Sequence, residues 1–368
     1  MLKRSLQFAP APTSRSPLPL VLAGVVLIAG TYGMARFGVG LLHPQMVAGR
    51  PDLDGALRPA GTAQFTSYCL AVLVGGRLAM RQARRLALAA GLVAGAGALG
   101  LMLAPDVATF TAAAFVAGAG AGLASPALVP LLDRAVPTAR SGLTQAAVNS
   151  GTAVGLLVVG TVVLVTSAAL TPWLMVAVVC VGAGWAVHRL APAVRVVEPG
   201  AVPDVEPGIA PDRVAGAAVA ARGMSLPWLL AAAAGGVSAY VWTFGPSEVV
   251  RDTDLGTEYI GWLWVAVGAG GLIGAVAGRL VDLTGPFLAF LACAAAILLA
   301  TTVVSTATQP WPAVLGLALF GAAYMALTGT LILWGRVLRP RDAGQATAWL
   351  FLALSVGQAV GTVLVGPA

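Results

Sequence analysis

Charged residues are scarce in this chain. Only 10% of its 368 residues are Asp, Glu, Lys or Arg, whereas soluble domains carry about 25%. Hydrophobic residues make up 58%, and the mean hydropathy is +0.90. So little charge cannot cover a globule of this size with polar surface, so the outer surface must face lipid. The composition excludes a soluble enzyme and indicates an integral membrane protein.

Metal-binding and redox-active residues are also few. The three cysteines, Cys69, Cys180 and Cys293, each lie inside an apolar run, without the spacing of a metal site or a disulfide. The only two histidines, His43 and His188, lie near the ends of apolar runs, so a zinc site is not expected. We expect the cysteines to pack between helices or to face lipid, and we expect no metal and no cofactor.

The net charge of +7 does not indicate a partner such as nucleic acid, because the 21 basic residues are spread over the short segments between apolar runs. Counted over alternate segments, 17 lie on one side and 3, Arg50, Arg58 and Arg251, on the other, with Arg36 inside the first run. The positive-inside bias then predicts that the N-terminus lies in the cytoplasm. The membrane that we expect to hold the protein is the plasma membrane, that is, the bacterial inner membrane.

Apolar runs long enough to cross about 30 Å of hydrocarbon, roughly 20 helical residues, recur along the whole chain. We expect helices, because lipid offers no partner to a bare backbone N–H or C=O. The first run is too long for the apolar core of a signal peptide, so we expect it to stay as a span. Eleven spans are predicted, near 18–42, 58–78, 85–104, 108–132, 141–166, 169–188, 226–247, 259–280, 285–305, 311–335 and 343–366.

The longest connection, 189–225, differs in composition from its surroundings. It contains Glu198-Pro199-Gly200 and Glu206-Pro207-Gly208 and has no helical periodicity, which is typical of a flexible linker. We predict a cytoplasmic tail (1–17), a six-helix half (18–188), a cytoplasmic linker (189–225) and a second half with five helices (226–368).

The two halves align without gaps at an offset of 202 residues, which indicates an internal repeat. The sixth span would recur at 371–390, and the chain stops at 368, so we expect the twelfth helix to be absent from this sequence. The uncommon matches lie at loops or span ends and pair Pro44 with Pro246, Asp52 with Asp254, Gly76-Arg77-Leu78 with Gly278-Arg279-Leu280, Arg134 with Arg336 and Gly142 with Gly344.

The segment from Gly76 to Arg85, Gly-Arg-Leu-Ala-Met-Arg-Gln-Ala-Arg-Arg, resembles the signature loop of the major facilitator superfamily, Gly-x-Leu-Ala-Asp-Arg-x-Gly-Arg-Arg. Met80 replaces the acid and Ala83 the second glycine, while the second copy keeps both, as Asp282 and Gly285. The resemblance implies an all-α, two-half bundle of about 11 transmembrane helices, six plus five. It also implies a conformational latch that holds the outward-facing state, formed by Gly76, Arg77, Leu78, Arg81, Arg84, Arg85, Gly278, Arg279, Asp282 and Gly285.

Two further features resemble this superfamily. The first span, with Arg36-Phe37 ahead of Leu41-Leu42-His43-Pro44, resembles the opening helix of the YbfB/YjiJ-type subgroup. The glycines of the fourth and fifth spans resemble a glycine-rich segment and an antiporter motif, although simple helix packing is the interpretation that we favour. These glycines are Gly118, Gly120 and Gly122, and Gly151, Gly155 and Gly160.

The family resemblance and the parallel repeat predict a secondary active or facilitative transporter that moves a small solute by alternating access around a central cavity. The alternatives are an efflux carrier for drugs or amphipathic compounds and a non-transporting sensor or scaffold. A membrane enzyme would need a constellation such as His-Glu-x-x-His or paired acids, which does not occur. We expect the partners to be the solute and the lipid bilayer, and we expect a monomer.

Coupling to protons has little support in the sequence. No Asp or Glu lies deep inside a predicted span, and Glu248 lies at the outer end of the seventh. A proton mechanism would have to use Glu248 or a proton of the substrate, so uniport or exchange is an equal expectation.

Arg36 is the predicted principal binding residue, and its predicted solute is a small organic carboxylate. An arginine near a helix centre costs roughly 2.5 to 3.5 kcal/mol on insertion scales, and its repeat counterpart is Ser238, so the fold itself does not require the charge. A guanidinium suits a carboxylate in bidentate geometry, whereas snorkelling to the outer interface is the alternative. The other predicted site residues are Tyr32, His43, Gln64, Tyr68, Gln145, Asn149, Tyr240 and Tyr324.

A topology experiment tests the predicted number of spans. Because eleven is odd, a reporter fused after Ala368 is expected outside the cell, and one fused after Gly200 in the linker is expected in the cytoplasm. Paired alkaline phosphatase and fluorescent-protein fusions measure both positions. A cytoplasmic reporter at Ala368 would contradict the count.

Overall fold

The computed structural model describes residues 16–166, 171–192, 213–253, 255–256, 259–274, 277–340 and 343–365. Every regular element in these ranges is a helix, so the predicted all-helical class is confirmed. The elements are α1 (Leu18–Ile28), η1 (Ala29–Arg36), α2 (Gly38–Gly49), η2 (Pro51–Leu53), α3 (Leu57–Leu103), α4 (Val107–Ala135), α5 (Thr138–Asn149), α6 (Gly151–Val165), α7 (Thr171–Leu190), α8 (Arg213–Thr243), α9 (Gly245–Asp252), α10 (Ile260–Gly274), α11 (Ala277–Thr284), α12 (Pro286–Thr306), α13 (Pro310–Leu338) and α14 (Ala343–Val365).

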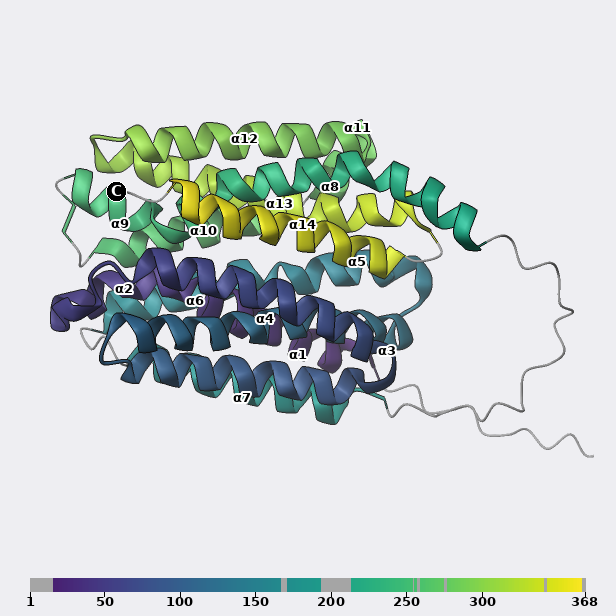
Figure 1. The fold of residues 1–368 in the computed structure, drawn as a ribbon, viewed down its shortest axis with the longest axis horizontal. Helices are drawn as coiled ribbons and strands as arrows, with labels where there is room; N and C mark the ends of the chain where they lie inside the picture. Colours follow the sequence, from purple (N-terminus) through teal and green to yellow (C-terminus); the bar gives the residue numbers. More distant parts are fainter. Residues whose placement is uncertain are drawn as a thin grey trace, which may run out of the picture.

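Helix α3 has 47 residues and turns back on itself at Gln82, where φ is −130° and ψ is 24°. A straight helix would separate Gln64 from Ala94 by about 45 Å. Both nevertheless pack against α4, because Gly118 lies against the backbone of Gln64 and Gly120 lies against Ala94. The two legs of α3 are therefore antiparallel neighbours (Figure 1).

The described residues contain nine helices that are long and apolar enough to cross a membrane. The bent pair Ile260–Gly274 and Gly278–Thr284, with an angle of 49°, forms a tenth candidate. One of the nine is α3, and when its two legs are counted separately the total equals the eleven spans predicted. Consistent with an odd number, α1 begins at one end of the bundle and α14 finishes at the other (Figure 1).

The two halves form two layers, α1 to α7 in purple to teal and α8 to α14 in green to yellow (Figure 1). The offset of 202 residues carries α4 onto 309–337, and α13 begins and ends one residue later. It also carries the turn of α3 at Gln82-Ala83 onto Thr284-Gly285, where α11 gives way to α12. Gly285 has a φ of +79°, a conformation that glycine adopts without strain. The first copy turns at negative φ, which explains why Ala83 is tolerated there.

Glycine allows the close helix contacts of the first half. A Cβ on Gly155 would lie 2.3 Å from the carbonyl oxygen of Ala29, and one on Gly33 would lie 2.4 Å from that of Thr152. Gly118, Gly120, Gly122 and Gly151 have equally close backbone or side-chain neighbours on facing helices. The interpretation of these glycines as packing residues is therefore confirmed. Gly160 packs against Gly261 of the other half.

The first span changes from an α-helix to a π-helix part of the way along its length. Ala29–Arg36 form a π-helix, and the N–H of Phe37 donates to the carbonyl of Tyr32 at 3.0 Å. Such wide turns are rare and occur frequently at functional sites. Every residue of this segment is buried, so Tyr32 and Arg36 lie inside the bundle and away from lipid.

The predicted division into tail, halves and linker remains a prediction. Helix α8 begins at Arg213, inside the segment predicted as linker, so that part of 189–225 is helical. Residues 1–15 of the predicted tail and 193–212 of the linker lie outside the described residues.

Gly155→Ala tests the contact between α6 and η1. The added methyl group meets backbone that cannot move away easily, so we expect a loss of about 1 to 3 kcal/mol in the free energy of unfolding. Gly182→Ala is the matched control, because a Cβ at Gly182 meets nothing within 4 Å. Thermal unfolding in detergent measures both variants, and equal midpoints would contradict the packing described.

Candidate functional site

Arg36 lies at the last position of η1, and its side chain joins the two halves. It is 2% exposed. Its Nη2 donates to Oγ of Ser355 at 3.2 Å and to Oε1 of Gln358 at 3.0 Å, both on α14. The snorkelling alternative is therefore wrong, because the guanidinium points to the partner half and not to an interface.

Aromatic rings surround the Arg36 guanidinium. Its Cζ lies 4.0 Å from the ring centroid of Tyr68 and 4.8 Å from that of Phe65. Phe37 and Tyr32 follow at 5.3 Å and 5.6 Å. Ring faces attract a cation, by about 2 kcal/mol or more when it is desolvated. The hydroxyls of Tyr32 and Tyr68 are hydrogen-bonded at 2.9 Å, which fixes the two rings relative to each other.

The positive charge of Arg36 has no anionic partner among the described residues. The ion pairs found there all involve Arg251, on α9. The Nε of Arg36 is buried and has no hydrogen-bond partner in the part of the chain that the structure describes. Leaving a buried charged donor unpaired is costly. The described groups that stabilise this cation are thus all neutral, and its Nε donor stays without an acceptor among them.

Gln358 connects Arg36 to the second half. Arginine only donates hydrogen bonds, so the oxygen of the Gln358 amide must face it. The amide nitrogen then donates to the hydroxyl of Tyr324 at 3.0 Å and to Oγ of Ser238 at 3.4 Å. Ser238 is the repeat counterpart of Arg36, so one amide bridges the two equivalent positions of the two halves.

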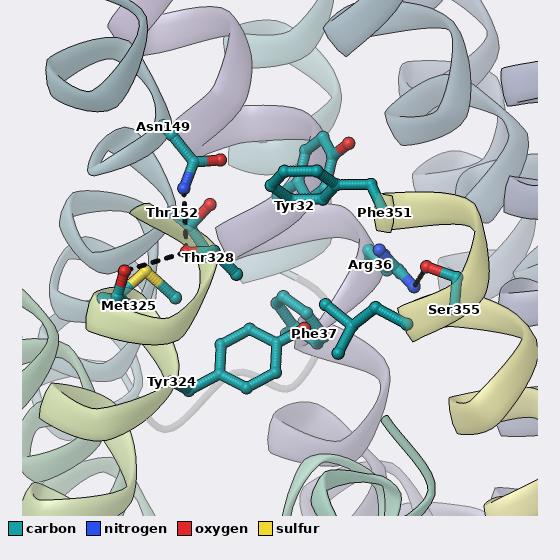
Figure 2. A pocket seen from close by; sticks show the side chains of 11 residues that line it. Tyr32, Arg36, Phe37, Asn149, Thr152, Tyr324, Met325, Thr328, Phe351 and Ser355 are labelled. Carbon is teal, nitrogen blue, oxygen red and sulfur yellow. Dashed lines mark hydrogen bonds between the residues drawn. The ribbon is translucent and has the colours of Figure 1, made fainter. Parts of the chain in front are cut away.

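A small cavity lies beside Arg36, between the halves. Figure 2 shows Arg36, Tyr32 and Asn149 of the first half facing Tyr324 and Ser355 of the second. The cavity volume open to water-sized molecules is about 10 Å³, enough for about one water molecule. The other lining residues are Phe37, Thr152, Met325, Thr328, Phe351 and Leu354.

The halves also meet on either side of this cavity. Towards the α2 end, the ring of Phe37 stacks on Trp242 with centroids 3.7 Å apart, and Gly40 lies against the carbonyl of Trp242. Towards the α5 end, Nη2 of Arg336 donates to Oγ of Ser141 at 3.1 Å. The halves are thus in contact on both sides of the cavity, a form that we call closed, and an organic solute needs them to move apart.

Four of the nine predicted site residues, Arg36, Tyr32, Asn149 and Tyr324, line the cavity. Nδ2 of Asn149 donates to Oγ1 of Thr328 across the halves at 3.0 Å (Figure 2). Tyr68 does not line the cavity, but its ring face contacts the Arg36 guanidinium in a cation–π interaction.

The other four predicted residues lie outside the cavity lining. Gln64 is buried on α3, and its Oε1 accepts no hydrogen bond from the described residues. His43 bonds through Nε2 to the carbonyl of Leu53 at 2.9 Å, towards the α2 end.

Gln145 and Tyr240 are likewise engaged elsewhere. Nε2 of Gln145 donates to Oδ1 of Asp133 at 3.0 Å, near the contact of Ser141 with Arg336. The ring of Tyr240 packs against that of Phe244, with centroids 6.4 Å apart.

Two residues of the predicted latch, Arg77 and Arg84, form hydrogen bonds, and both do so within the first half. Nε of Arg84 donates to the carbonyl of His188 at 3.0 Å, while Nδ1 of His188 donates to the carbonyl of Arg84 at 3.1 Å. Arg77 bonds to the carbonyl of Leu73 on its own helix. Asp282 is exposed and forms no ion pair with the described residues. Leu78 is exposed, and Arg81, Arg85 and Arg279 form no side-chain hydrogen bond with the described residues. Gly76 and Gly278 border open space, and Gly285 makes the turn.

Sequence reasoning missed Ser355 and Gln358, which hold Arg36. A signal was present, because Ser355, Gln358 and Thr362 recur at spacings of three and four in an otherwise apolar run and so share one helix face. The hydrophobic residues that line the cavity carry no comparable signal.

The family model of the Major Facilitator Superfamily matches residues 17–362. A mutant of the nucleoside transporter NupG is similar in structure, with a TM-score of 0.68 and 10% identity over 94% of this chain and 90% of that chain. A bacterial homologue of the human lysosomal transporter Spinster, inward-facing and unoccupied, has a TM-score of 0.66 and 15% identity, over 94% of this chain and 81% of that chain. At these identities the likeness concerns the fold alone. No curated protein sequence matches the chain.

Two substitutions of Tyr68 test the aromatic support of Arg36. Tyr68→Leu removes the ring face, so we expect a loss of about 2 kcal/mol or more in the free energy of unfolding. Tyr68→Phe keeps the face and loses only the hydrogen bond to Tyr32, about 1 kcal/mol. Thermal unfolding of both variants ranks them, and an equal loss would argue against the cation–π contact.

Proposed function

Because the chain belongs to the Major Facilitator Superfamily, we propose that it is a transporter of a small organic anion and that Arg36 binds that anion. The observation that carries the proposal is the buried guanidinium of Arg36, which has an unpaired Nε and no described carboxylate beside it. A carboxylate of the solute supplies the missing charge and the missing acceptor together.

The shape of the cavity supports alternating access. The site lies between two halves related by an internal repeat, the arrangement in which such carriers rock one half against the other. With room for about one water molecule, the closed form holds no organic solute. Entry requires separation at one end, for example at Phe37 and Trp242 or at Ser141 and Arg336.

Uniport or exchange of solutes fits the distribution of acids better than proton coupling. Glu248, the acid that a proton mechanism would have to use, lies on α9 and is ion-paired with Arg251. Burial raises the pKa of the Glu248 carboxyl, while the Arg251 guanidinium lowers it. Glu248 is not among the residues that line the cavity.

Export of amphipathic compounds is the second candidate. The observation in its favour is the aromatic share of the cavity lining, with Phe37, Tyr324 and Phe351 beside Met325. Such surfaces suit flat apolar solutes. Arg36 then selects those amphipathic compounds that carry a negative charge.

The finer assignments are part of the same proposal. A bacterial inner membrane with a cytoplasmic N-terminus is supported by the distribution of basic residues, 17 against 3. The YbfB/YjiJ-type subgroup is supported by the run from Arg36-Phe37 to Pro44. We propose that the protein acts as a monomer, with the latch of the signature loops controlling its outward-facing state.

Uptake into proteoliposomes tests the role of Arg36. The panel contains labelled acetate, lactate, succinate and benzoate, with uridine as a neutral solute and tetraphenylphosphonium as a cation. We expect Arg36→Gln to abolish carboxylate uptake at unchanged expression. Arg36→Lys keeps the charge but loses the bidentate geometry, so its affinity is expected to fall at least about tenfold, or 1.4 kcal/mol.

Arg251→Gln is the control, because it removes an arginine at the outer end that lies outside the cavity lining. It is expected to transport normally. Normal carboxylate uptake by Arg36→Gln, or a panel in which only uridine or the cation is carried, would overturn the proposal.

A further inference from the structure

We propose that Gln358 determines the charge of the solute that the central site accepts. Its neutral amide holds the Arg36 guanidinium in place without cancelling its charge, so the site keeps a net positive charge for an anion. This inference rests on the proposed function, because it assigns a second residue to the same site.

Of the two described side chains that accept hydrogen bonds from Arg36, only Gln358 has an acid of the same shape, glutamate, which would neutralise the guanidinium. The Oε1 of Gln358 lies 3.0 Å from Nη2 of Arg36, and the residue is 0% exposed. Ser355, the other acceptor, is too short to reach further and offers only a hydroxyl. A carboxylate in the place of the Gln358 amide would form an ion pair at the distance typical of charge-assisted hydrogen bonds.

The remaining bonds of Gln358 fix the direction of its amide. Its Nε2 donates to Tyr324 and to Ser238, which both belong to the second half. With the nitrogen held there, the oxygen is directed at Arg36. A glutamate would lose the amide N–H donors to Tyr324 and Ser238, whose hydroxyls would have to donate instead, and it would cancel the charge of Arg36.

The repeat explains why one residue carries this role. Arg36 and Ser238 occupy equivalent positions in the two halves, and Gln358 contacts both. Only one of the two positions is charged, so the charge of the shared partner decides the net charge between the halves. A neutral partner gives a net charge of one, and an acidic partner gives zero.

The arrangement of the two acceptors explains why the Nε donor of Arg36 has no partner among the described residues. Gln358 and Ser355 both bond to Nη2 and leave Nε unpaired. A carboxylate that reaches the site has this donor available and competes with the amide oxygen for Nη2. Neutral acceptors are easier to displace from a guanidinium than an anion is.

Carboxylate and amide pairs of equal shape test the proposal. Uptake into proteoliposomes is measured for acetate and acetamide, lactate and lactamide, and benzoate and benzamide. Wild type is expected to prefer the carboxylate in the pair that it transports. Gln358→Glu is expected to lower that preference at least tenfold, with uptake of the neutral amide retained.

Two further variants keep the test valid if Gln358→Glu folds poorly. Gln358→Met is neutral and of similar size, so it is expected to keep the carboxylate preference at reduced affinity. The double variant Arg36→Gln/Gln358→Arg moves the cation from the first half to the second. It is expected to keep the preference for the carboxylate as well. Size-exclusion chromatography in detergent checks that each variant is folded.

The outcomes separate the two proposals. If no carboxylate is preferred by wild type, the proposed function is wrong and the inference falls with it. If wild type prefers carboxylates and Arg36→Gln does not, but Gln358→Glu keeps the wild-type preference, the role of Gln358 alone is overturned. A carboxylate preference lost in Gln358→Met as fully as in Gln358→Glu also overturns it, because charge is then not the cause.

Discussion

The burial of a single cation organises the centre of this protein. Arg36 lies inside a membrane span and is 2% exposed, and the described part of the chain offers it no carboxylate. Its charge is instead stabilised by ring faces from its own half and by two neutral acceptors from the other. The winding of the first span, the fold of α3 and the polar face of α14 all contribute groups to this one guanidinium.

The scaffold around this cation is repeated, and the cation is not. Helix α4 recurs as α13, and the turn at Gln82-Ala83 recurs at Thr284-Gly285, at the repeat offset to within one residue. A repeated scaffold allows the halves to rock as similar bodies. The difference between Arg36 and Ser238 at equivalent positions then gives the shared cavity its charge, and Gln358 joins the two. In the proposed mechanism, the repeat permits the motion of the halves, and the difference between Arg36 and Ser238 provides the charge that binds the solute.

Much of the fold could be predicted from the sequence, because hydrophobic length and the repeat leave few alternatives. The spans, the packing role of Gly155 and the burial of Arg36 with Tyr32 follow from such patterns. The fold-back of α3 at Gln82 was implied by the predicted spans, although a continuous run of helical residues there gives little local sign of it. The π-helix was not predicted, because no residue type specifies a change from α to π winding.

The site could be predicted only in part, for a physical reason. Polar residues in a span are satisfied by whichever neighbour packs against them, so polarity alone does not separate cavity residues from helix contacts. Gln145 and His43 bond to Asp133 and to the Leu53 carbonyl, away from the cavity. Gln358 was missed because its partner is 322 positions away in the sequence, a contact that only the packing of the two halves reveals.

The most direct measurement is an experimental structure of the chain in lipid nanodiscs with a transported carboxylate at saturation. The account predicts density for the carboxylate between the halves, with its oxygens about 3 Å from Nε and Nη2 of Arg36. It also predicts a cavity larger than the closed one. A carboxylate bound elsewhere, with Nε of Arg36 still unpaired and Gln358 still in place, would contradict it.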